Sequence, residues 1–138
     1  MATNLVAIAA PPGGYGRYRA QEIESILVTA YTGFRAAVLE SQRGQDGAPQ
    51  VVVHTGYWGC GAFGGNRVLM ALLQTLAATL AGLDRLVFHT GDAAERTPLA
   101  TALGIAHGEL DDGGVIPTAE LIGRIAAMGF EWGASDGN

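Results

Sequence analysis

The chain has 138 residues, of which 49% are hydrophobic, and a formal net charge of −5. This length and composition are typical of one globular domain, so we expect a single domain over residues 1–138. All eight basic residues are arginines, which excludes a lysine nucleophile, and Cys60 is the only cysteine, which excludes an internal disulfide and a cysteine-based zinc site. The acidic balance argues against nonspecific nucleic-acid binding, which needs a basic surface. No apolar run is long enough to cross a membrane, so we expect a cytoplasmic protein that makes no membrane contact.

Apolar runs and helical periodicity alternate along the first half of the chain. Residues 5–10 predict a buried strand, which ends at the Pro-Pro-Gly-Gly segment that follows. Apolar residues recur at spacings of three and four from Ile23 to Val38, which predicts a helix. Residues 51–54 then predict a second strand, and residues 68–80 predict a second helix that ends at a Gly82 C-cap.

The second half of the chain continues the same alternation. Its expected elements are a strand at 86–89, a helix at 94–103, a short fourth strand at 105–110 and a final helix at 117–128. Nearly continuous apolar strands that alternate with helices predict an α/β fold, a three-layer α/β/α arrangement around a mostly parallel sheet. Ligands bind beyond the carboxyl ends of the strands in such sheets. We therefore expect the loops at 11–18, 54–66 and 89–95 to form one site.

The loop between the second strand and the second helix is rich in glycine. Five glycines, at positions 56, 59, 61, 64 and 65, let the backbone curl closely around a ligand. The free N–H groups of the helix that follows suit an anion, above all a phosphate. The loop carries neither a Gly-Lys-Ser/Thr sequence nor a GxGxxG spacing, so it is neither a Walker loop nor a dinucleotide fingerprint. A loop that only packs is the alternative, but Trp58 and Phe63 favour a ligand, because exposed aromatic side chains are costly.

The sequence YWGCGAFGG at residues 57–65 is similar to the diphosphate-binding loop of poly(ADP-ribose) glycohydrolases, a branch of the macrodomain fold. The flanking segments agree in order. Residues 5–8 resemble the upstream strand of these enzymes, residues 30–34 their helix-end motif, and residues 88–92 their strand and loop near the adenine. The similarity spans roughly residues 4–128. It implies a truncated macrodomain-like fold that corresponds to the carboxyl-terminal half of the catalytic domain.

The chain departs from the family pattern at several positions. The family's catalytic segment, a triple glycine followed by Gln-Glu-Glu, lies upstream of the matched region and is absent here. Tyr57 stands where the family has asparagine, Asn66 where it has aspartate, and Thr90 where it has an adenine-stacking phenylalanine. The resemblance thus implies a diphosphate-binding loop, and it assigns no catalytic residue.

The resemblance also implies roles for particular residues of the loop. Phe63 packs against a ribose of the ligand, with a plug of the core as the alternative, while Trp58 anchors the loop. Tyr57 is a candidate for a new ligand contact through its hydroxyl group or its ring. Cys60 contributes its backbone rather than a nucleophilic thiolate. The predicted ligand-binding residues are Tyr57, Gly59, Cys60, Gly61, Ala62, Phe63, Gly64, His89 and Thr90.

Two further groups of side chains carry potential chemistry. His54 and His89 end neighbouring strands and, with Asp92, could transfer a proton or hold a metal. We favour the simpler reading, in which the backbone satisfies both histidines, and we expect no metal and no cofactor. An acidic cluster at Glu109, Asp111 and Asp112 is more typical of a solvated loop than of a ribose or metal contact.

Three functions follow from these observations. The first is binding, without catalysis, of ADP-ribose or a related NAD-derived nucleotide, either free or attached to a protein. The second is an ADP-ribosyl glycohydrolase that uses Glu22, Asp92 or Glu109 as a replacement acid, or that a second subunit completes. The third is a half-domain that forms a homodimer, because a truncated sheet leaves an open edge.

Overall fold

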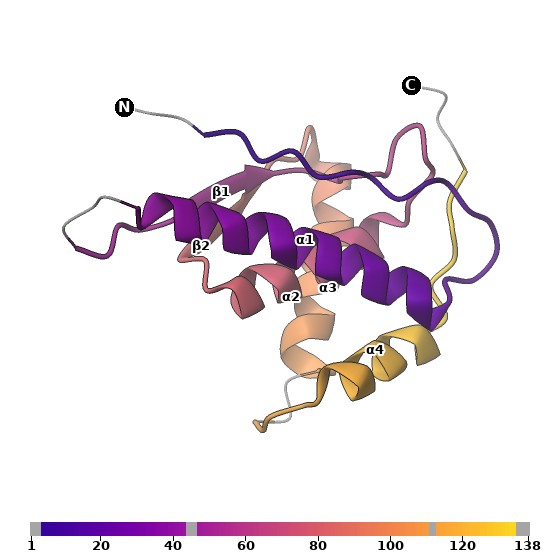
Figure 1. Ribbon diagram of the computed structural model, residues 1–138. Coiled ribbons are helices and arrows are strands. Elements are labelled where there is room, and N and C mark those ends of the chain that lie inside the picture. Colours follow the sequence, from indigo (N-terminus) through magenta and orange to yellow (C-terminus); the bar gives the residue numbers. More distant parts are fainter. Residues whose placement is uncertain (1–3, 44–46, 111–112, 135–138) are drawn as a thin grey trace.

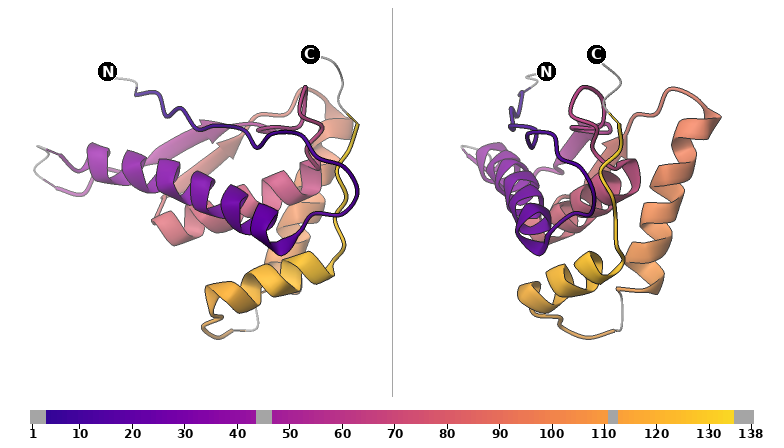
Figure 2. Two further views of the ribbon diagram at one scale, coloured as in Figure 1. Left: turned by 45° about the vertical axis from the view of Figure 1, so that its right-hand side comes forward. Right: turned by 90° about the vertical axis from the view of Figure 1, so that its right-hand side faces the viewer.

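The computed structural model describes residues 4–43, 47–110 and 113–134 (Figure 1). Its elements are α1 (Ala20–Ser41), β1 (Val52–Thr55), α2 (Arg67–Ala81), β2 (Arg85–Phe88), α3 (Ala93–Gly108) and α4 (Thr118–Ala127). In the described part of the chain, β1 and β2 form a parallel pair in which Val52 lies opposite Arg85 and Thr55 opposite Phe88. Helix α2 lies between α1 and α3, beneath this sheet (Figure 2, right). The predicted strands at 51–54 and 86–89 and the four predicted helices are thus confirmed.

Residues 5–10 do not form the strand that their apolar sequence predicts. They run extended beside α1, where the side chains of Val6 and Ile8 approach Gly33. Their backbone makes no hydrogen bond to another described segment, and Leu5 is 96% exposed. A strand needs hydrogen bonds from a neighbouring backbone, and apolar residues alone do not supply that neighbour.

The fourth strand predicted at residues 105–110 is also wrong. Helix α3 continues to Gly108, and the N–H of Glu109 still bonds to the Ile105 carbonyl at 2.9 Å. Ala102 and Ile105 continue the apolar face that α3 turns toward the core, so a helix buries these residues better than a strand. The described sheet therefore has two strands. The class remains α/β, but the expected three-layer arrangement is not confirmed.

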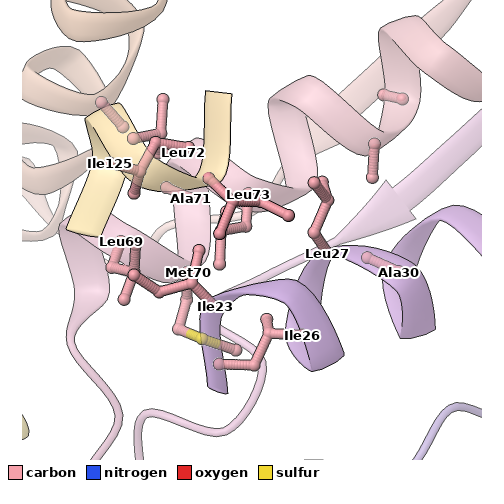
Figure 3. Close-up of a cluster of buried hydrophobic side chains, with 14 of the residues drawn as sticks. Ile23, Ile26, Leu27, Ala30, Leu69, Met70, Ala71, Leu72, Leu73 and Ile125 are labelled. Atoms are coloured by element: carbon pink, nitrogen blue, oxygen red, sulfur yellow. The ribbon is translucent and has the colours of Figure 1, made fainter. Parts of the chain in front are cut away.

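The hydrophobic core lies where α1 and α4 meet α2 (Figure 3). Each fully buried Leu or Ile stabilises the fold by about 1.5–3 kcal/mol relative to an exposed side chain. Helix α2 is apolar on almost every face, so it forms the centre of the molecule. The glycine-rich loop that precedes α2 is therefore attached to the core at its C-terminal end. The labelled core residues are Ile23, Ile26, Leu27, Ala30, Leu69, Met70, Ala71, Leu72, Leu73 and Ile125.

Residues 130–133 return from α4 to the segment before α1 and to the glycine-rich loop. The indole of Trp132 stacks on the ring of Tyr18 with 4.2 Å between the ring centroids. The N–H of Gly133 donates to the Gly64 carbonyl at 2.8 Å, and Asn66 Nδ2 donates to the Glu131 carbonyl at 2.9 Å. The last described residues thus hold the loop where it joins α2.

In the part of the chain that the structure describes, none of the helices combines the length and apolar character that a bilayer crossing requires.

Candidate functional site: the glycine-rich loop

The glycine-rich loop, residues 56–65, leaves β1 at its carboxyl end and enters α2. The loop is held by bonds between its own backbone groups. Gly65 N donates to Gly59 O at 2.9 Å, and Gly64 N donates to Gly61 O at 2.9 Å. Gly59 and Gly64 adopt φ values of 75° and 62°, which residues with a Cβ rarely adopt. This tight fold explains why the sequence needs glycine at these positions.

Between Gly59 and Gly64, three backbone N–H groups have no acceptor among the described residues. Those of Gly59, Gly61 and Phe63 donate no hydrogen bond to any described residue, whereas those of Cys60 and Gly64 bond within the loop. Of the predicted ligand residues, Cys60 and Gly64 therefore shape the loop. Gly59, Gly61 and Phe63 retain donors that an anion could use.

The two aromatic residues of the loop differ in exposure. Phe63 is 47% exposed, so it is not the core plug that was its alternative role. Trp58 packs against the hydrophobic core, as predicted for an anchor, and its Nε1 is buried without a partner among the described residues. Trp58 also borders a cavity of about 430 Å³ between residues 9–12 and α1.

Cys60 is buried beneath the loop, with its thiol 3.7 Å from the Trp58 carbonyl. Burial raises the pKa of this thiol to about 12, and the nearby charge of Arg67 opposes the rise only in part. The thiolate is the reactive form of cysteine. Cys60 is consequently a structural residue, in agreement with the sequence.

Tyr57 joins the loop to α3. Its hydroxyl group donates to the carbonyl of Glu95 and accepts from the N–H of Leu99 at 3.2 Å. Its ring meets Phe88 edge-on, and the guanidinium carbon of Arg67 lies 5.6 Å from the ring centroid. Because the hydroxyl group is bonded within the protein, only the ring is left for a ligand contact.

The three loops predicted to form one site do meet. A Cβ built on Gly13 would lie 3.0 Å from the Phe63 carbonyl oxygen, and one on Gly56 would lie 3.6 Å from the His89 carbonyl oxygen. The N–H of His89 also donates to the Thr55 carbonyl at 2.9 Å. The segments around residues 13, 56–65 and 89 therefore surround one edge of the sheet, with His89 exposed and Thr90 half-buried beside it.

His54 and His89 lie side by side at this edge, as the predicted strand pairing required. His54 Nδ1 is 2.8 Å from His89 Nε2, so the two side chains bond to each other rather than to the backbone. Asp92 does not join them, because its carboxylate accepts from the N–H of Glu95 at the start of α3. The described residues contain no cluster of three His, Cys, Asp or Glu side chains that could hold a metal.

The three candidate acids are engaged or distant. The Glu22 carboxylate accepts from the backbone N–H and from Nε of Arg19, at 2.7 and 3.3 Å. Partial burial opposes the ionisation of Glu22, but these bonds outweigh it and lower its pKa. Glu109 ends the 16-residue helix that Asp92 begins, so it lies about 24 Å away along that helix. Asp111 and Asp112 lie outside the described residues.

Sequence reasoning missed three residues around the loop. Arg67 presents a cation beside it, and Gln74 bonds to its first carbonyl. Trp132 stacks on Tyr18, whose hydroxyl group accepts from the N–H of Asn66 at the end of the loop. The signal for Gln74 was a polar residue on an apolar helix, and the signal for Arg67 was a cation directly after the loop. Trp132 carried no comparable signal.

The family model for poly(ADP-ribose) glycohydrolase, macro domain fold, matches residues 1–97. The match covers α1, both strands, the glycine-rich loop and α2, and it ends in the first turns of α3. Helix α4 and residues 130–133 lie beyond it. Since the match spans more than half of the sequence and includes the loop that carries the resemblance, this chain belongs to the poly(ADP-ribose) glycohydrolase family and resembles the C-terminal part of its catalytic domain.

Proposed function

We propose that this protein binds ADP-ribose, or a related NAD-derived nucleotide, through the glycine-rich loop. The observation that carries the proposal is the set of N–H groups at Gly59, Gly61 and Phe63 that have no acceptor among the described residues, in a loop whose shape is held by the amides of Cys60, Gly64 and Gly65. Unbonded amide donors in one short loop suit the oxygens of a diphosphate. The exposed ring of Phe63 offers a ribose an apolar surface beside them.

The positions of the three candidate carboxylates favour binding without hydrolysis. Cleavage of a glycosidic bond needs a carboxyl group within hydrogen-bond reach of the leaving oxygen. Glu22 is held ionised by Arg19, Asp92 caps α3, and Glu109 lies at the far end of that helix. The ligand is accordingly ADP-ribose itself or an ADP-ribosylated protein, which the site would retain rather than cleave.

The proposal is tested by calorimetric titration of ADP-ribose into the wild-type protein and two variants. Phe63→Ala removes the exposed ring at the site, and Leu80→Ala removes a side chain of similar exposure, 54%, at the other end of α2. We expect the wild type and Leu80→Ala to bind alike and Phe63→Ala to bind at least about tenfold more weakly. Wild-type protein that does not bind, or Phe63→Ala that binds normally, would contradict the proposal.

A release assay separates binding from catalysis. Protein that carries mono- or poly-ADP-ribose is incubated with the wild type, and free ADP-ribose is measured. We expect retention of the modified protein and no release. Release would instead favour the glycohydrolase.

The extended segment at residues 5–10 favours a second proposal, that a strand of another chain pairs with this segment. Its backbone bonds to no other described segment, and Leu5 and Val6 are exposed, which makes it a ready template for strand pairing. A second copy of the chain or a complementing subunit would supply the missing neighbour. Light scattering tests the first of these, since a homodimer has twice the 14.2 kDa mass of the chain.

A further inference from the structure

Arg67 is the first residue of α2 and follows the glycine-rich loop directly. Its side chain is exposed, and its guanidinium lies over the ring of Tyr57, 5.6 Å from the ring centroid. Its charge also opposes the effect of burial on the pKa of both Tyr57 and Cys60. The guanidinium therefore lies at the protein surface next to the loop.

No described carboxylate pairs with Arg67. The ion pairs of the described chain engage Arg17, Arg19, Arg43 and Arg124. The cation–π contact with the Tyr57 ring is weak at an exposed position. An arginine can instead donate two parallel, charge-assisted hydrogen bonds to a phosphate, which is a stronger interaction. A phosphate on the loop would consequently draw the guanidinium away from the ring.

Two uncharged residues flank the guanidinium of Arg67. Asn66, directly before Arg67, carries no negative charge, and its side chain accepts from the N–H of Leu69 at 3.1 Å. Tyr57 provides the ring over which the Arg67 guanidinium lies. Neither residue carries a charge that would neutralise the guanidinium.

We infer that Arg67 donates to a phosphate of the bound ligand and makes the site select nucleotides with a diphosphate over uncharged nucleosides. This inference rests on the proposed function and adds a side chain to a site otherwise built from backbone. Tyr57 holds the guanidinium beside the loop until the ligand arrives. The diphosphate, with its two negative charges, then accepts hydrogen bonds from the free amides of Gly61 and Phe63 and from the guanidinium of Arg67.

The test compares Arg67→Ala and Arg67→Gln with Arg85→Ala. Arg85 is also exposed and has no ion pair to a described residue, but it begins β2 at the opposite edge of the sheet from the loop. ADP-ribose and adenosine are titrated into each variant by calorimetry. We expect both Arg67 variants to bind ADP-ribose about 10- to 100-fold more weakly, with unchanged affinity for adenosine and weaker dependence on salt. Arg85→Ala should bind as the wild type does.

The binding data distinguish failure of this inference alone from failure of the proposed function. If the wild type binds ADP-ribose, Phe63→Ala weakens binding and both Arg67 variants bind as tightly as Arg85→Ala, the role of Arg67 is overturned and the loop site stands. An equal loss for adenosine and ADP-ribose would also overturn it, because charge would then not be the cause. Absence of wild-type binding overturns both. Thermal unfolding of each variant shows whether it is folded. If Arg67→Ala does not fold, Arg67→Gln still tests the role of the charge, because it keeps a side chain of similar length.

Discussion

Gln74 of α2 fixes the first residue of the glycine-rich loop, since its Nε2 donates to the Gly56 carbonyl at 3.0 Å. Gln74 is fully buried, and its Oε1 accepts from the Thr55 hydroxyl group at 2.6 Å. Buried polar side chains with all their partners present specify one arrangement of the chain around them. The helix at the centre of the core therefore sets the position of the loop.

Replacement of Gln74 by Met keeps its approximate volume but removes both bonds. We expect the free energy of unfolding in urea to fall by about 1–3 kcal/mol, because the Gly56 carbonyl and the Thr55 hydroxyl group lose their partner. ADP-ribose binding should weaken as well, since the loop loses its support. Thr79→Ala, at an exposed position of the same helix, should change stability by less than about 0.5 kcal/mol. Equal losses in the two variants would exclude this role for Gln74.

Gly65 and Gly104 should respond in opposite directions to alanine. A Cβ on Gly65 would lie 2.7 Å from the Gly59 carbonyl oxygen, so Gly65→Ala must distort the loop and cost about 1–3 kcal/mol. A Cβ on Gly104, within α3, would meet no atom within 4 Å, and Gly104→Ala should stabilise by about 0.5–1 kcal/mol. Urea unfolding measures both. A tolerated Gly65→Ala would show that the loop packs less tightly than described.

Tyr57→Phe removes the hydroxyl group that joins the loop to α3 and keeps the ring. We expect a loss of about 0.5–1.5 kcal/mol in unfolding free energy and faster amide exchange at Leu99, whose N–H loses its acceptor. Affinity for ADP-ribose should change little, because the hydroxyl group is bonded within the protein. A large loss of affinity without a loss of stability would instead assign the hydroxyl group to the ligand.

The Cys60 thiol should resist alkylation in the folded protein. Its burial, with a pKa of about 12, leaves almost no thiolate at pH 8. Iodoacetamide should modify the native protein slowly and the protein in denaturant rapidly, as mass spectrometry can follow. Rapid labelling under native conditions would mean that the loop opens or that the thiol is activated.

Alkaline pH should destabilise the fold. Burial raises the pKa of Cys60 from 9.0, and that of Tyr18 from 10.0, to about 12 in each case. Between about pH 9 and pH 12 the unfolded chain loses protons that the folded chain retains, so stability is complete below pH 9 and falls as the pH rises. Urea unfolding at pH 8, 9.5 and 10.5 measures the fall, which should be smaller in Cys60→Ala. An identical fall in that variant would exclude a contribution from the thiol.

Local patterns in the sequence determined the first two helices of this protein, the glycine-rich loop and the cap at Gly82. The apolar spacing of residues 23–38 and 68–80 predicts helices that the structure contains, and the run of glycines before α2 predicts the loop and its resemblance. Gly82 was identified as a C-cap from its residue type, and it adopts the left-handed φ of 76°. These features depend on residues close together in the chain, so sequence alone suffices for them.

Only the tertiary structure decided which segments pair. Residues 5–10 and 105–110 were both predicted as strands, yet the first is extended without a backbone partner among the described residues and the second continues α3 to Gly108, because pairing depends on distant segments. The contacts of Gln74 with Gly56, Arg67 with Tyr57 and His54 with His89 likewise join residues from different elements. The glycine content of the loop predicted that its backbone could curl around an anion. Tertiary packing decided which of its amides remain free and which cation stands beside them.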